Sequence, residues 1–137
     1  MIQEDKNLLL QDLCSRLPYG IRCSFGVDDA IYEITGVNPS SCGASEIQAT
    51  HIKSGINGDF TISSCKPYLF PLSSMTEEQK KEFDQLIELE LKAINDEIDH
   101  IQATAFEVDF YNKHHFDWRG LIPLGLANDA TGLNIYY

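Results

Sequence analysis

The feature that most constrains the fold is an apolar repeat in the second half of the chain. Its members are separated by four, four, three, four and three positions, and they are Phe83, Ile87, Leu91, Ile94, Ile98 and Ile101. At about 100° per residue they fall within an arc of about 80°, which predicts a long helix with one apolar side. Thr76 to Gln79 fit a capping box, so the helix is expected to begin there.

Acidic residues cover the other sides of this predicted helix. Residues 76–99 hold nine acids and three lysines, a net charge of −6 out of −11 for the chain. Three interpretations stay open: a solvated face, a seam with another helix, or an acidic face that imitates a phosphate backbone. The candidate acidic interaction face comprises Glu88, Leu89, Glu90, Asp96 and Glu97.

A second capping box at Thr104 to Glu107 predicts a break and then a fresh helix that ends near His115. Earlier in the chain, the spacing of Leu9, Leu10, Leu13, Cys14 and Leu17 gives one apolar face to a short helix over residues 6–16.

Alternating apolar and polar residues predict a β-rich section between these helical parts. The expected strands are 21–25, 30–35, 46–53 and 59–64, with Asn57–Gly58 as a hairpin turn and residues 65–75 as an extended, packed connector. The predicted fold is a single α+β domain over residues 1–137. It consists of an N-terminal helix, a small antiparallel meander sheet or barrel of four to five strands, and two C-terminal helices packed on it.

Charge and composition exclude several function classes. A net charge of −11 disfavours direct nucleic-acid binding and anionic membrane surfaces, both of which require Lys and Arg. No phosphate-binding, dinucleotide-binding or zinc-protease motif occurs, so no cofactor or metal is predicted. Apolar runs are too short to span a bilayer.

The cysteines and the first residues bear on the compartment. Cys14, Cys23, Cys42 and Cys65 form no C-x-x-C pair, and the first residues lack a signal-peptide pattern. A cytoplasmic protein with reduced thiols is therefore expected, with two disulfides as the alternative.

One segment concentrates chemically active side chains. The candidate ligand or functional cluster is His114, His115, Asp117, Trp118 and Arg119. Adjacent histidines point about 100° apart on a helix, so they do not suit one shared metal ion. The competing interpretation is structural: histidines ending a helix, a tryptophan anchoring the tail, and an arginine paired with an acid.

Three blocks of sequence resemble a family of short proteins of unknown activity from gut Bacteroidetes and their prophages or mobile elements. The blocks are LLLQDLCSRLPYG (8–20), KPYLFPLSSMTEE (66–78) and DWRGLIPLGLA (117–127). In this family an aromatic residue, usually tyrosine, is expected where Trp118 stands. The resemblance implies a bacterial cytoplasmic setting and a link to phage or mobile-element biology, and it carries over no catalytic residue.

These observations predict a non-enzymatic accessory protein, a monomer or homodimer, that acts by binding another protein. One alternative is an acidic mimic that occupies the DNA- or RNA-binding groove of its partner. Another is a small hydrolase or transferase that uses His114, His115, Asp117 and Arg119.

Overall fold

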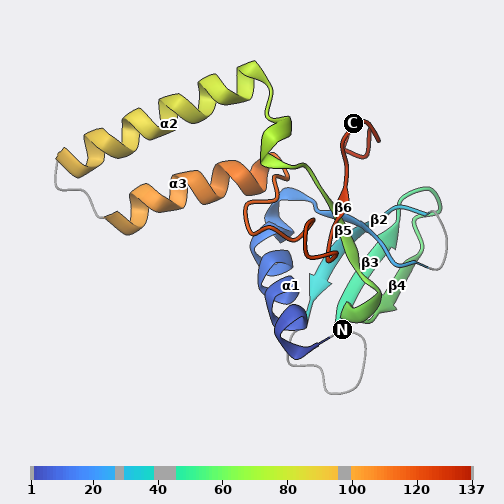
Figure 1. Ribbon diagram of the computed structural model, residues 1–137. Helices are drawn as coiled ribbons and strands as arrows, with labels where there is room; N and C mark the ends of the chain where they lie inside the picture. Colours follow the sequence, from blue (N-terminus) through green and yellow to red (C-terminus); the bar gives the residue numbers. More distant parts are fainter. Residues whose placement is uncertain (1, 27–29, 39–45, 96–99, 137) are drawn as a thin grey trace.

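The computed structural model describes residues 2–26, 30–38, 46–95 and 100–136, with side chains described outside 90–106. It has an N-terminal helix, an open sheet and a helical hairpin that reaches away from the sheet (Figure 1). The predicted α+β class is confirmed.

The sheet has six strands in the order β4-β3-β2-β1-β5-β6, antiparallel except for the parallel pair β5–β6. It exceeds the predicted four to five strands because the expected connector supplies β5 and the tail supplies β6. The bounds are Arg22–Ser24 (β1), Tyr32–Val37 (β2), Ile47–His51 (β3), Asn57–Phe60 (β4), Lys66–Leu69 (β5) and Asn128–Asp129 (β6).

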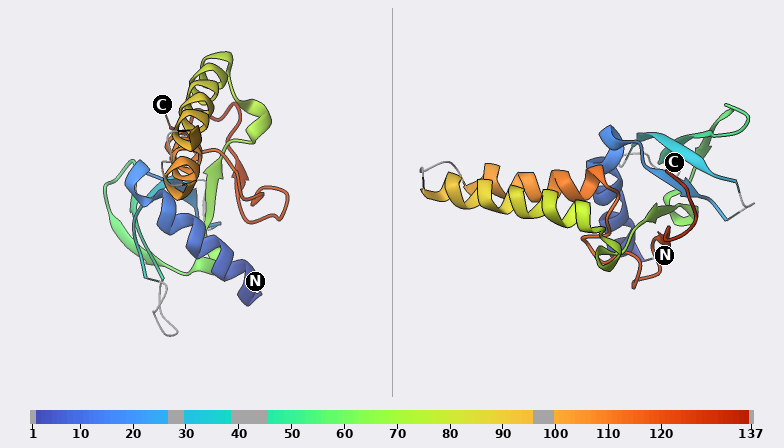
Figure 2. Two further views of the ribbon diagram at one scale, coloured as in Figure 1. Left: turned by 90° about the vertical axis from the view of Figure 1, so that its left-hand side faces the viewer. Right: turned by 90° about the horizontal axis from the view of Figure 1, so that it is seen from above.

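Helix α1 (Gln3–Arg16) covers one face of this sheet, and the core lies between them (Figure 2). Leu9 and Leu13 are fully buried, as the apolar spacing predicts, and so are Asp12 and Arg16. Cys14, which was assigned to the apolar face, is exposed. The buried side of α1 is therefore turned from the predicted one, so that it includes Asp12 and Arg16 instead of Cys14. The strands and the tail contribute Ile21, Cys23, Phe25, Ile34, Ile47, Ala49, Ile62, Cys65, Leu69, Leu121, Leu126 and Ala127 to the core.

Two sequence predictions about the β3–β4 hairpin are wrong. Asn57 and Gly58 lie inside β4 rather than in the turn. The turn comes earlier, where Gly55 adopts a φ of +71° and donates its N–H to the His51 carbonyl at 2.8 Å. Residues 62–64, which were expected to continue the strand, form a short 3₁₀ helix.

Helices α2 (Glu77–Asn95) and α3 (His100–Lys113) pack against each other, and most of their length projects from the body of the molecule (Figures 1 and 2). The ring of Phe83 lies 5.3 Å from that of Phe110 and 5.5 Å from that of Tyr111. At this end of the hairpin the apolar side of α2 thus faces α3, whereas both helices were expected to lie on the sheet. None of the helices in the described ranges has the length and hydrophobicity needed to cross a membrane.

The first predicted capping box is confirmed and the second is wrong. Thr76 donates its N–H to Gln79 Oε1 at 2.9 Å, and Gln79 returns its N–H to Thr76 Oγ1 at 3.2 Å. Residues 104–107 lie inside α3, which begins at His100. A Thr-x-x-Glu pattern starts a helix only where the preceding backbone leaves the helical conformation, and here it does not.

Candidate functional site

The predicted cluster begins where α3 ends. Phe116 donates its N–H to the Tyr111 carbonyl at 2.8 Å, and His115 donates to the Asn112 carbonyl at 3.2 Å. This is a Schellman motif with His115 in the left-handed position, at a φ of 61°. The predicted helix end near His115 is thereby confirmed, although a histidine occupies a position that favours glycine.

The two histidines lie in different surroundings. His114 Nε2 is 3.3 Å from Glu82 Oε2 on α2. The ring of His115 stacks on Tyr136, with centroids 3.6 Å apart and planes 7° apart. Burial, together with the charges of Arg16, His114 and Arg22, lowers the pKa of His115 to about 4. His115 is thus neutral at pH 7, and the expectation of a cation that stabilises the helix end is wrong for this residue.

Tyr136 ties the tail to the sheet. Its hydroxyl accepts the Arg22 N–H at 3.1 Å and donates to the Tyr68 carbonyl at 2.7 Å. Arg22 Nη1 also donates to the Ile135 carbonyl at 2.6 Å. The hydroxyl therefore bridges β1 and β5 beyond their last paired residues, and burial raises its pKa.

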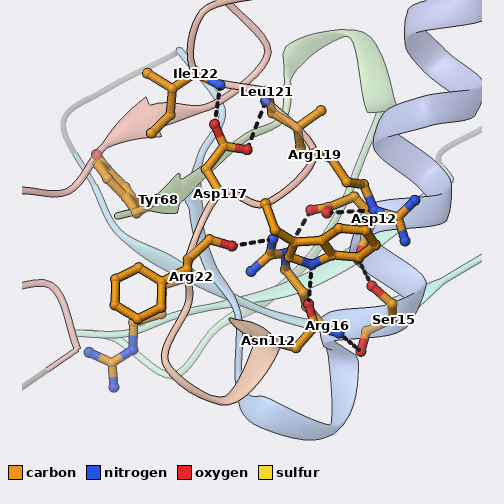
Figure 3. A network of polar contacts seen from close by, with 12 residues as sticks. Asp12, Ser15, Arg16, Arg22, Tyr68, Asn112, Asp117, Arg119, Leu121 and Ile122 are labelled. Atoms are coloured by element: carbon orange, nitrogen blue, oxygen red, sulfur yellow. Dashed lines mark hydrogen bonds and ion pairs between the residues drawn. The ribbon is translucent and has the colours of Figure 1, made fainter. Parts of the chain in front are cut away.

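Asp117 shapes the apolar tail that follows the cluster. Its carboxylate is buried and accepts the backbone N–H of Leu121 at 2.7 Å and of Ile122 at 2.9 Å (Figure 3). These two hydrogen bonds give partners to the backbone N–H groups of the turn that brings Leu121 into the core. The geometry gives Asp117 a structural task.

Trp118 and Arg119 face the first helix. Trp118 Nε1 donates to Asn112 Oδ1 at 2.9 Å, and the guanidinium carbon of Arg119 lies 4.2 Å from the centre of the Trp118 ring. Arg119 Nε is 3.1 Å from Asp12 Oδ1, an ion pair without the alignment of a hydrogen bond. Arg119, a member of the candidate ligand cluster, is thus stacked on a ring and paired with an acid of this protein.

The centre of this network was not predicted from the sequence. Asp12 and Arg16 form a fully buried ion pair with Nε and Oδ2 2.8 Å apart, and Arg16 Nη2 donates to the Phe116 carbonyl at 2.6 Å (Figure 3). Their four-residue spacing was a visible signal, because such residues share one helix face. Their burial was not visible, because it depends on a carbonyl 100 residues away.

We call Asp12, Arg16, Asn112, Trp118 and Arg119 the buried junction, since they join α1, α3 and the tail. Arg16 Nη1 has no hydrogen-bond partner among the described residues, and one carboxylate serves two guanidiniums. In the whole described part of the chain, no three side chains of His, Cys, Asp or Glu lie close enough together to hold a metal ion. The junction is suited to holding segments together.

The predicted acidic interaction face lies elsewhere, on the projecting hairpin. Glu88 and Leu89 are exposed on α2, and 55% of Leu89 is accessible to solvent. Glu90 belongs to α2, while Asp96 and Glu97 lie outside the described residues. The two predicted sites are therefore on different parts of the molecule.

Comparison of this chain with protein-family models, curated proteins and solved structures finds no match. The resemblance carried by the three sequence blocks stays a prediction.

Proposed function

We propose that this protein is a non-enzymatic binding module that presents the α2–α3 hairpin to a partner protein with a basic surface. The observation that carries the proposal is the projection of an acidic hairpin from the body (Figure 1). Residues 76–113 contain eleven acids and four bases, a net charge of −7, while the other residues contain ten and six, a net charge of −4.

Part of the hairpin forms a defined ridge. Glu77, Asp84 and Glu88 are exposed and share one side of α2, within about 40° of helical rotation, with Lys81 among them. Leu89 is also exposed, about 100° around the helix axis from Glu88. The carboxylates of the ridge attract a basic partner over a distance and orient it.

The acidic mimic is a special case of this proposal, in which the partner is itself a nucleic-acid-binding protein. Charge concentration on one projecting element favours it, because such a partner offers a basic groove. The resemblance to proteins of prophages and mobile elements makes the native bacterial host and its phage proteins the first place to look.

Charge reversal tests the ridge. The variant D84K/E88K is compared with E4K/D5K, which changes the net charge equally but alters two acids in the first turn of α1, on the body. Partners are captured from a lysate of the native host, identified, purified and titrated. Because each exposed ion pair contributes modestly and reversal adds repulsion, we expect about a tenfold loss of affinity for D84K/E88K. The control variant should bind within about twofold of wild type.

Salt provides a second readout, since exposed ion pairs are screened over about 8 to 10 Å at physiological ionic strength. Wild-type binding should weaken with rising salt more steeply than binding by D84K/E88K. Equal affinities for wild type and D84K/E88K at low salt would exclude the ridge as the binding surface. Capture of a nucleic-acid-binding protein, displaced by DNA or RNA, would support the mimic.

A further inference from the structure

Strand β4 lies at the edge of the sheet and has β3 as its one strand neighbour in the described part of the chain. The His51 N–H donates to the Ile56 carbonyl at 2.9 Å, and the register continues with Thr50 opposite Asn57. Hydrogen-bonded pairs alternate along an antiparallel ladder. The N–H and C=O groups of Asn57 and Asp59 therefore point away from β3, toward the open edge.

The two sides of this edge differ in polarity. On the solvent side a hollow of about 390 Å³ is lined by Thr35, Gln48, Asn57, Gly58 and Asp59. A β-bulge between Ile34 and Gly36 gives β2 an irregular register beside it.

Toward the core side of the same strand, the alternation places Ile56, Gly58 and Phe60 in one row. Ile56 is 69% exposed, and Phe60 is half-buried in a stack with Phe25 whose ring centroids are 3.9 Å apart. The edge thus offers a polar, acidic row on one side and an apolar row on the other.

Native proteins block open edges with very short strands, charged residues (above all lysine), proline, bulges or covering segments. The strand Asn57-Gly58-Asp59-Phe60 is four residues long and contains neither lysine nor proline, and its charged residue is an acid, which repels acidic strands and attracts basic ones. We propose that β4 accepts an extended segment of a partner protein as a seventh strand, one in which apolar residues alternate with lysine or arginine. The partner's basic residues lie beside Asp59, and its apolar residues contact Ile56 and Phe60.

Charge selects this occupant over a second copy of the chain. Pairing two β4 strands would bring together two chains of net charge −11 and place two Asp59 carboxylates along one short edge. The inference rests on the proposed function only in taking a protein as the partner. It uses a different surface from the ridge on α2.

The probe is the peptide acetyl-Lys-Val-Lys-Val-Lys-amide, added to the ¹⁵N-labelled full chain and followed by amide chemical shifts and hydrogen exchange. Binding at β4 should shift the amide signals of residues 56–60 and slow exchange at Asn57 and Asp59 several-fold. The peptides Lys-Val-Pro-Val-Lys, which lacks the central donor, and Glu-Val-Glu-Val-Glu should bind at least about tenfold and fivefold more weakly. Shifts spread over all acidic surfaces, or equal binding of the proline peptide, would overturn the proposal.

Two variants at one position separate backbone from charge. D59P removes an N–H that faces the edge and leaves pairing with β3 possible, so it should weaken the probe at least about tenfold. D59N keeps the backbone and removes the charge, for which about a two- to fivefold loss is expected. Unchanged dispersion of the remaining amide signals checks the fold of each variant, and if D59P unfolds, D59N and the proline peptide still decide the question.

The variant D84K/E88K distinguishes failure here from failure of the proposed function. It should bind the peptide as wild type does, while losing the partner that binds the α2 ridge. Sedimentation of the free chain tests the other occupant: a dimer that D59P dissociates would replace the partner segment by a second copy and refute the proposal.

Discussion

The buried junction and the projecting hairpin use the same kinds of charged side chain in opposite ways. In the junction, the side chains of Asp12 and Arg16 are both 0% exposed and Nε–Oδ2 is 2.8 Å. In the hairpin, Glu77 pairs with Lys80 and Glu82 with Lys113, each at 3.5 Å and largely in solvent. A buried ion pair holds its two segments in one arrangement, because separating its charges inside the protein is costly. An exposed ion pair is weak, so its side chains can exchange partners.

This difference suggests that stability and recognition are separated in the molecule. In the junction, Arg16 of α1 donates a hydrogen bond to the Phe116 carbonyl, 100 positions away. If the tail detached, the buried guanidinium of Arg16 would lose this acceptor. The hairpin is attached through the end of α3 and packs mainly on itself. A change in the junction should therefore cost far more stability than a change on the surface of the hairpin.

Arg16→Met should give the largest loss of stability. It leaves the Asp12 carboxylate buried with Arg119 as its remaining cation and removes the hydrogen bond to the Phe116 carbonyl. Breaking a buried pair from one side costs about 3 to 5 kcal/mol. Urea unfolding at pH 7 measures the change. A loss below about 1 kcal/mol would show that the junction does not hold the tail.

His115, whose ring stacks on Tyr136, should make the attachment of the tail sensitive to acid. Its pKa is about 4 in the folded protein, against 6.5 for the exposed side chain, so the unfolded chain binds the proton more readily. The stabilising contribution is fully present above about pH 6.5 and decreases as the pH falls toward 4. Allowing for partial solvent screening, we expect about 2 kcal/mol between pH 7 and 4.5.

The measurement is the difference between wild type and His115→Asn in unfolding free energy at pH 7 and at pH 4.5. Asparagine tolerates a positive φ, so the backbone conformation is retained while the titrating ring is removed. The variant should be less stable at pH 7, because it loses the stack on Tyr136. The gap should narrow at pH 4.5, and a constant gap would mean that His115 does not titrate in this range.

Lys80→Ala should produce the smallest effect. The lysine and Glu77 are exposed, with 55% and 86% of their side chains in solvent. An exposed pair of this kind contributes about 0.2 to 0.5 kcal/mol. Thermal unfolding should therefore match wild type within about 2 °C. A loss comparable with that of Arg16→Met would contradict the contrast between the two regions.

Local signals in the sequence predicted the parts of the fold that short-range chemistry decides. Thr76 and Gln79 satisfy each other's backbone N–H groups within one turn, and α3 ends at hydrogen bonds that span no more than five residues, from Phe116 to Tyr111 and from His115 to Asn112. The turn predicted at Asn57–Gly58 was wrong because the position of a hairpin turn also sets which side chains of the two strands face the core. Moving the turn to residues 52–55 places Ile47, Ala49 and Phe60 on the core side of the β3–β4 pair.

The residues of the candidate cluster follow one another in the chain, but most of the side chains that they contact could not be predicted. Trp118 meets Asn112 six residues away, a contact within reach of local reasoning. Arg119 meets Asp12 across 107 positions, and His115 meets Tyr136 after the tail has added β6 to the edge of the sheet. Periodicity and propensity carry no information about such pairs, because they describe neighbours along the chain.

The sequence by itself determined the α+β class, the places of most helices and strands, and the concentration of acids on residues 76–99, since each follows from spacing and charge. Only the tertiary structure decided that Arg16 is buried, that Arg119 is paired, and that β4 is the edge strand of the sheet within the described residues. The physical reason is that burial and edge position depend on which distant segments exclude water from a side chain or a strand.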